Sequence, residues 1–207
     1  MPLIRRVLAS AVLAALLSLS VASAFAQSRP PATALPPLPK RAETHVYLMR
    51  GLLGVFSLGM DDLAVKLNTN GYRSNVYGWD SWQTVAEVIA QRYDGGHRGP
   101  IVVIGHSLGA NAVFYVADDL QRRSIPVLLG VTFDATEPGK VPTNVMTFVN
   151  FWARDGFGKP VEAVPGYNGE LDNIDLSNRP DVDHMSIDSL DQFHKFVIGN
   201  LEKMTSQ

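Results

Sequence analysis

The feature that most constrains the fold is an apolar, β-branched run at residues 101–104 that leads into the string Gly-His-Ser-Leu-Gly at 105–109. The run predicts a buried strand, and the apolar spacing over residues 110–122 predicts a helix with one buried face. The turn between them brings strand and helix so close that only glycine fits at positions 105 and 109. The segment therefore predicts a strand, a strained turn and a helix, with Ser107 presented at the end of the strand.

The rest of the chain alternates strand-like and helix-like segments. Short apolar runs predict strands, and apolar residues at helical spacing predict helices. Strands are expected at 45–49, 74–79, 125–133 and 145–152, and helices at 60–69, 81–93 and 188–201. This alternation implies an α/β fold, a three-layer α/β/α sandwich with a mostly parallel sheet, and it places a functional site at the carboxyl ends of the strands.

The first residues have the pattern of an export signal. Arg5 and Arg6 precede an apolar run at 7–21, and Ala24-Phe25-Ala26 forms a small-x-small cleavage site. The run is shorter than the roughly 20 apolar residues that a membrane span needs. We therefore expect residues 1–26 to be a signal peptide that is removed, with no stable membrane span afterwards and a mature protein that is periplasmic or extracellular.

Composition limits the remaining possibilities. Residues 27–41 contain five prolines and predict an extended linker, so that 42–207 forms a single globular domain. The chain has no cysteine, which excludes disulfides and thiolate chemistry. A net charge of -2 with interspersed signs gives no electrostatic footprint for nucleic acid. The acidic residues between 172 and 183 lack the spacing of a calcium loop, and no metal site is expected.

A serine hydroxyl is a weak nucleophile and needs a base to take its proton, a task for which histidine is suited near neutral pH. His184 is the candidate base because it lies in a loop ahead of the last helix, whereas His106 adjoins Ser107 and is expected to point away from it. The base needs a buried carboxylate on its other nitrogen. Asp134 follows the strand after Ser107, and Asp155 follows the next strand and is the alternative acid.

With these residues the chain resembles the α/β-hydrolase superfamily over nearly all of 44–201. Residues 105–109 match the family's nucleophile elbow, residues 50–54 (Arg-Gly-Leu-Leu-Gly) match its oxyanion loop, and the candidates occur in the family's order of Ser, Asp and His. The chain is similar to small lidless lipases and esterases and to thioesterase domains. This resemblance implies a minimal α/β-hydrolase fold.

The negative charge that develops on an attacked carbonyl oxygen needs preorganised amide donors. The amide of Leu108, at the start of the predicted helix, is one candidate, and the family pattern implies that the amide of Leu52 is the second. Arg50 stands where the family often has histidine. We expect Arg50 to form a structural salt bridge rather than to meet an anionic substrate.

These expectations describe an exported serine hydrolase that cleaves an ester or thioester through an acyl-enzyme intermediate, without a cofactor. The substrate would be a small-molecule or lipid-like acyl compound, selected by a long loop over residues 155–183. The alternative is a hydrolase-like binding or interaction protein without turnover. The sequence leaves open the acyl chain length, the choice between ester, thioester and amide, and the oligomeric state.

Overall fold

The structure is a computed structural model that describes residues 41–52, 57–153 and 155–206. The signal peptide predicted at 1–26 lies outside the described residues, as does the predicted linker apart from Arg41. Among the residues that are described, no helix is both long and apolar enough to cross a membrane.

Six strands form one sheet in the order β2-β1-β3-β4-β6-β8, and every neighbouring pair is parallel. The strands of this sheet are β1 (His45–Arg50), β2 (Arg73–Gly78), β3 (Ile101–His106), β4 (Val127–Phe133), β6 (Val145–Ala153) and β8 (Glu170–Leu176). Two short strands, β5 (Lys140–Val141) and β7 (Glu162–Ala163), pair with each other apart from it. Because all six strands run in one direction, their carboxyl ends meet at one edge of the sheet.

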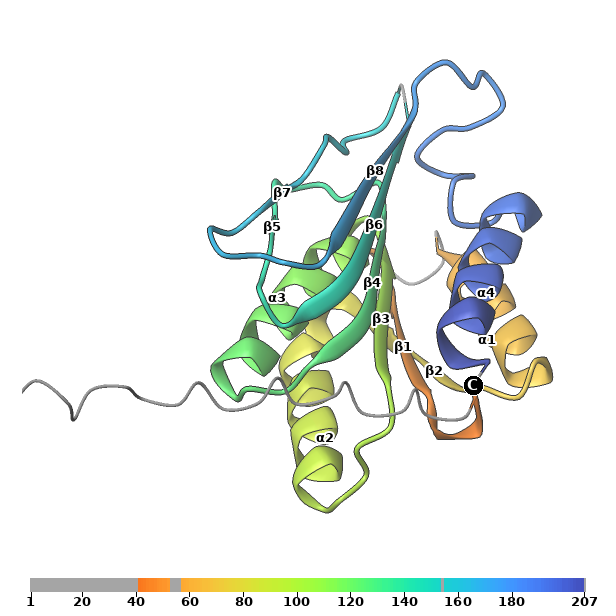
Figure 1. Cartoon of the computed structure of the whole chain (residues 1–207). Coiled ribbons are helices and arrows are strands. Elements are labelled where there is room, and N and C mark those ends of the chain that lie inside the picture. Colours follow the sequence, from red (N-terminus) through yellow and green to blue (C-terminus); the bar gives the residue numbers. More distant parts are fainter. Residues whose placement is uncertain (1–40, 53–56, 154, 207) are drawn as a thin grey trace, which may run out of the picture. The chain divides into compact units, whose positions relative to one another are not determined.

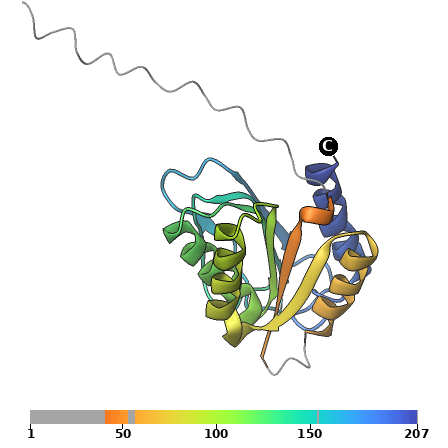
Figure 2. The ribbon, with the colours of Figure 1, turned by 90° about the horizontal axis from the view of Figure 1, so that it is seen from below.

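Four helices cover the two faces of this sheet (Figures 1 and 2). Helices α2 (Trp82–Asp94) and α3 (Leu108–Arg122) lie on one face, and α1 (Leu58–Thr69) and α4 (Asp191–Thr205) lie on the other. Short 3-10 turns, η1 (Arg41–Glu43) and η2 (Trp79–Ser81), precede β1 and α2. The predicted three-layer α/β/α sandwich with a parallel sheet is confirmed.

The apolar run of β3 is continuous because this strand is buried on both faces. Val102 and Ile104 belong to the core beneath α1 and α4, whereas Ile101 and Val103 belong to the core beneath α2 and α3. Burial of such side chains contributes about 1.5–3 kcal/mol each to folding. The central position of β3 therefore fixes the place at which its last residue delivers Ser107.

Two expectations about the C-terminal part need correction. The predicted loop at 155–183 contains β7 and β8, and β8 is a full strand of the main sheet. It was missed because it lies at the sheet edge, is mostly exposed and carries acidic residues in place of an apolar run. The last helix begins at Asp191 rather than at 188, because the preceding residues form turns.

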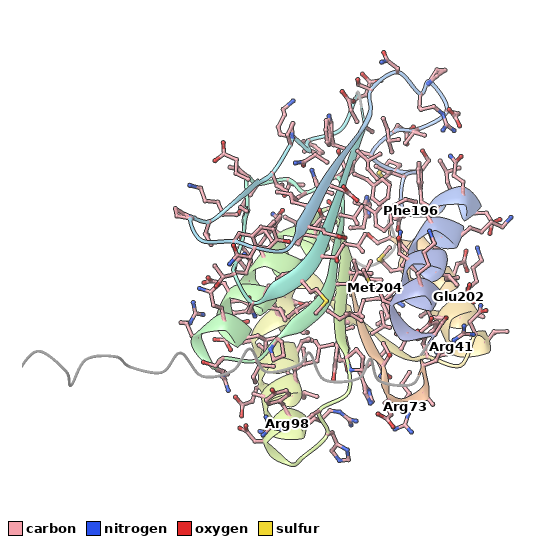
Figure 3. All side chains as sticks on the ribbon, in the orientation of Figure 1. Arg41, Arg73, Arg98, Phe196, Glu202 and Met204 are labelled. Atoms are coloured by element: carbon pink, nitrogen blue, oxygen red, sulfur yellow. The ribbon has the colours of Figure 1, made fainter. Side chains whose placement is uncertain are left out.

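Contacts of Phe196 and Glu202, less than two turns apart on α4, join this helix to the rest of the domain (Figure 3). Arg41 pairs with Glu202 at 3.2 Å and donates to the carbonyl of Asn70, so η1 is held against α4 and the end of α1. Phe196 packs edge-on against Phe151 of β6 at 5.5 Å between ring centroids. The helix that follows His184 in the chain is thereby fixed on the sheet.

Candidate active site

Ser107 forms the turn between β3 and α3 with a positive φ of 58° and a ψ of -124°. Such a conformation costs a non-glycine residue of the order of 1–3 kcal/mol. A Cβ at position 105 would overlap the backbone of Gly109, and a Cβ at 109 would overlap the carbonyl of Met49. The predicted requirement for glycine at both positions is confirmed, and the strained turn is held by a hydrogen bond from the Ser107 amide to the Phe133 carbonyl.

The structure brings Ser107, His184 and Asp134 together in one hydrogen-bonded chain. The Ser107 Oγ lies 3.0 Å from His184 Nε2, and the His184 Nδ1 lies 2.5 Å from Asp134 Oδ2. Because a carboxylate accepts hydrogen bonds, the neutral imidazole carries its hydrogen on Nδ1 and offers the lone pair of Nε2 to the serine hydroxyl. The arrangement is suited to removing a proton from Ser107.

Asp134 is fully buried, at the end of β4, in a pocket of amide donors. Its carboxylate accepts hydrogen bonds from the amides of Ala153, Phe157 and Gly158 at 3.0–3.2 Å, besides the one from His184. Burial by itself raises the pKa of this carboxyl, but these hydrogen bonds outweigh it and hold the pKa below its ordinary value. Asp134 is therefore ionised at neutral pH.

Asp155, the alternative acid, lies on the turn that wraps around Asp134 and is exposed. Within the described residues its side chain has no hydrogen bond or ion pair, and the structure does not bring it to His184. The following Gly156 approaches Asp134 so closely that a Cβ there would overlap both carboxylate oxygens. The turn at 155–158 thus supplies amide donors to Asp134 rather than a second carboxylate.

The two predicted oxyanion donors, Leu52 and Leu108, line the same cavity as Ser107. Leu108 is the first residue of α3, so its amide has no acceptor within the helix and adds to the positive end of the helix dipole. Leu52 follows β1, and a Cβ on its neighbour Gly51 would lie 2.9 Å from the Ser107 Cβ. Residues 53–56 of the predicted oxyanion loop lie outside the described residues. The oxyanion role of Leu52 and Leu108 stays a prediction.

Arg50, at the end of β1, is engaged by a carboxylate. Its Nε donates to Asp61 Oδ2 at 2.8 Å, and its Nη2 contacts Asp61 Oδ1. The structural salt bridge expected for Arg50 is confirmed.

A cavity of about 320 Å³ opens beside Ser107 and His184. It is lined by Leu52, Ser57, His106, Ser107, Leu108, Thr136, Phe157, His184 and Met185, none of which is an acid, lysine or arginine. Three apolar side chains form its exposed rim: Leu52 is 53% exposed, Phe157 62% and Met185 50%. Phe157 also packs edge-on against the His184 ring at 4.9 Å. The cavity is therefore suited to an uncharged, apolar group.

Sequence reasoning missed several residues that shape this site. Asn111 is buried in α3, where its side chain accepts from the amide of Thr136 at 2.9 Å and donates to the Thr136 hydroxyl at 2.7 Å. These contacts fix the segment that follows Asp134. A polar residue among the buried positions of a helix, one turn after Ser107, was the available signal.

The acidic residues considered as a calcium cluster are engaged separately. Asp181 pairs with Arg179 at 2.6 Å, and Asp183 accepts hydrogen bonds from the amides of Met185 and Ser186. Within the described part of the chain, no three acidic or histidine side chains are grouped closely enough to hold a metal ion.

His106 and Asp188 form a buried pair beneath the cavity. The His106 ring packs 4.9 Å from the His184 ring, and burial lowers the pKa of His106 to about 4. Asp188 Oδ2 lies 3.7 Å from His106 Nδ1 and has no hydrogen-bond partner within the described residues. Burial raises the pKa of Asp188 to about 6. At neutral pH an ionised carboxylate is therefore held in a poorly compensated position.

Replacing Asp188 by asparagine should stabilise the protein increasingly as pH rises from 4 to 7. The unfolded chain ionises Asp188 near pH 4 and the folded protein only near pH 6, so wild type loses stability over this interval. Between acid pH, where Asp188 is protonated in both states, and pH 7, the difference between variant and wild type should grow by about 3 kcal/mol. Urea unfolding at several pH values would measure it, with exposed Asp94→Asn as control. A difference between Asp188→Asn and wild type that does not change with pH would contradict this prediction.

No protein-family model matches this chain, and no curated protein matches it. Among solved structures it is similar to the type II thioesterase BorB from the borrelidin biosynthetic cluster, with a TM-score of 0.51 and 12% identity over 81% of this chain and 95% of that one.

Two further solved structures overlap with most of the chain. A putative hydrolase of the α/β superfamily from Xanthomonas campestris pv. campestris has a TM-score of 0.40 and 16% identity over 75% of this chain and 98% of that one. An acetyl xylan esterase has a TM-score of 0.46 and 10% identity over 79% and 98%. At such identities a likeness shows the fold alone, and here it is the likeness to the thioesterase BorB that shows it. The chain has an α/β-hydrolase-like fold, as its sequence predicts.

Proposed function

We propose that the protein is an exported serine hydrolase that cleaves a carboxylic ester or thioester through a Ser107–His184–Asp134 triad. The observation that carries this proposal is the unbroken hydrogen-bonded chain from the Ser107 hydroxyl to the buried Asp134 carboxylate. The serine lies on a strained turn beside an open cavity, as a nucleophile requires. The export signal predicted at residues 1–26 supports action outside the cytoplasm.

In the first half of the reaction, the Ser107 Oγ attacks the carbonyl carbon of the substrate while His184 Nε2 takes the hydroxyl proton. The carbonyl π electrons move to its oxygen, where the amides of Leu108 and Leu52 stabilise the negative charge. Ionised Asp134 orients the imidazole and stabilises the imidazolium that forms. The tetrahedral intermediate collapses, the bond to the leaving group breaks, and His184 returns the proton to that group.

In the second half, a water molecule replaces the leaving group. His184 takes a proton from this water as its oxygen attacks the carbonyl carbon of the acyl-enzyme. Collapse of the second intermediate breaks the bond to Ser107 Oγ, and His184 returns the proton to that oxygen. The products are the free acid and the original enzyme, and the reaction needs no cofactor.

The lining of the cavity favours a neutral, apolar acyl group. Leu52, Phe157 and Met185 offer apolar surface at the rim, and no lining side chain among the described residues carries a fixed charge. Placing an unpaired anion there would require desolvation without compensation. We therefore expect butanoate or octanoate p-nitrophenyl esters to be hydrolysed with a kcat/KM at least about tenfold higher than an ester whose acyl chain ends in a carboxylate.

Labelling of the full chain with a fluorophosphonate, followed by peptide sequencing, tests the proposal directly. We expect the label on Ser107. We also expect hydrolysis of p-nitrophenyl esters, and we expect the ester to slow the labelling because both reagents react at Ser107. A thioester with the same acyl group would determine which leaving group is preferred. Folded protein that takes no label on Ser107 would favour the alternative of a hydrolase-like binding protein without turnover.

A further inference from the structure

Ser57 is a fully buried polar residue that the proposed reaction does not use. It directly precedes α1, and its hydroxyl lies between two other groups of the site. The Ser57 Oγ is 2.9 Å from the amide nitrogen of Gly51 and 2.7 Å from the Nδ1 of His106. On its other side, the His106 ring places Nε2 2.8 Å from the carbonyl oxygen of His184.

The direction of each hydrogen bond in this group follows from its end points. The carbonyl of His184 only accepts, so His106 Nε2 carries the hydrogen. The buried His106 ring is neutral near pH 7, so its Nδ1 offers a lone pair and accepts the Ser57 hydroxyl hydrogen. The Ser57 oxygen in turn accepts from the Gly51 amide. Each donor therefore meets an acceptor, in a single chain from the Gly51 amide to the His184 carbonyl.

This chain also explains why the Oδ2 of Asp188 has no hydrogen-bond partner within the described residues, whereas its Oδ1 accepts from the Ser189 hydroxyl at 3.2 Å. Asp188 Oδ2 is 3.7 Å from His106 Nδ1, but that nitrogen presents a lone pair rather than a hydrogen. The polar contact of His106 on this side is with Ser57. The hydroxyl of Ser57 is thus the link between the His106 ring and the segment after β1.

The chain connects three segments that surround the nucleophile. Gly51 begins the segment that carries the Leu52 amide, and it is pressed against Ser107. His106 directly precedes Ser107 at the end of β3. His184 belongs to the segment between β8 and α4, and its carbonyl is held on the opposite side of the His106 ring. A shift of Ser57 or His106 would move the proposed base and the proposed oxyanion donor relative to Ser107.

We infer that Ser57 and His106 are positioning residues, whose buried hydrogen-bonded chain from the Gly51 amide to the His184 carbonyl sets the placement of the Leu52 amide and of the base. This inference rests on the proposed function. Misplacement of reacting groups by about 1 Å can reduce a rate by about 10²-fold. Loss of the chain should therefore reduce kcat, because the binding of an apolar acyl group at the rim does not depend on it.

Two variants interrupt the chain at different points. Ser57→Ala removes the hydroxyl with little change in volume, and His106→Gln removes the imidazole that joins Ser57 to His184. We expect each to lower kcat for p-nitrophenyl butanoate by about 10- to 100-fold, with KM within about twofold of wild type. Because both residues belong to one chain, the loss of kcat in the double variant should be close to the larger of the two single losses, rather than to their product.

Ser74→Ala is the matched control for a buried serine hydroxyl. Ser74 lies in β2, away from the cavity, and donates to the Ala64 carbonyl at 2.9 Å. We expect this control to lower the melting temperature by an amount similar to Ser57→Ala while leaving kcat and KM unchanged. The rate of fluorophosphonate labelling at Ser107 provides a second measure of positioning that does not depend on substrate binding.

The outcomes separate this inference from the proposed function. If wild type hydrolyses the ester and Ser57→Ala and His106→Gln both keep wild-type kcat and labelling rate, the inference is wrong while the hydrolase stands. If the two losses multiply in the double variant, the residues act independently and the single chain is wrong. If folded wild type neither turns over the ester nor labels at Ser107, the proposed function fails and the inference fails with it.

Discussion

Replacing Ser107 by alanine is expected to lower kcat for ester hydrolysis by about 10⁵-fold or more, because the acyl-enzyme pathway is lost. Replacing it by glycine should abolish turnover equally but raise the free energy of unfolding. At φ 58° and ψ -124° a side chain is strained by about 1–3 kcal/mol, and glycine relieves this strain. The greater freedom of glycine in the unfolded chain offsets about 0.5–1 kcal/mol of this relief. The free energy of unfolding should therefore rise by a net amount of the order of 1 kcal/mol.

The chain offers a matched control for this prediction. Ser124, after the end of α3, also has a positive φ of 57°, and the hydrogen bond from Ile125 to the Leu120 carbonyl closes the helix around it. Ser124→Gly should raise stability by a similar amount and leave turnover unchanged. Urea unfolding and ester hydrolysis would measure both effects. Greater stability only for Ser124→Gly would show that Ser107 is not strained, and turnover by Ser107→Ala would identify another nucleophile.

Among the strands of the sheet, those buried on both faces have the clearest sequence pattern. Residues of β3 contribute alternately to both cores, so the strand is visible as an uninterrupted apolar run. Within the described sheet, the edge strand β8 pairs on one side only, with β6, and most of its side chains are exposed. Its acidic side chains are solvated and do not form the apolar run of a buried strand, so the sequence did not predict a strand there.

The serine and histidine of the candidate site were accessible to sequence reasoning for different physical reasons. The elbow requires glycine on both sides of Ser107, so the local sequence alone indicates a strained turn. His184 was identified by its place before the last helix. The carboxylate was harder to choose, because β4 and β6 are neighbours and both end at the same edge of the sheet. Spacing along the chain does not separate two aspartates at such adjacent ends.

The supporting contacts have no local sequence pattern. Ser57 and His106 are 49 residues apart, and His106 reaches a carbonyl 78 residues further along the chain. The expectation that His106 points away from Ser107 omitted the contacts that it makes instead. Asp188 was assigned to the last helix, whereas it is buried before that helix begins. Long-range hydrogen bonds of this kind follow only from the packed arrangement of the segments.

Replacing Asp134 by asparagine should lower kcat by about 10³- to 10⁴-fold, whereas Asp155→Asn should leave it within about twofold of wild type. The asparagine amide would donate to His184 Nδ1, which forces the ring hydrogen onto Nε2. That nitrogen would then face Ser107 Oγ with a hydrogen instead of a lone pair, so it could not take the hydroxyl proton. Asp155 is exposed and contacts neither residue in the described structure.

Steady-state kinetics with p-nitrophenyl butanoate would measure both variants, and thermal unfolding would show that each is folded. Asp134→Asn should slow fluorophosphonate labelling of Ser107 in parallel with kcat, because both reactions require the same proton transfer. A larger loss in Asp155→Asn would reassign the acid to the turn that surrounds Asp134. Equal and small losses in both variants would show that His184 keeps its working tautomer without a carboxylate.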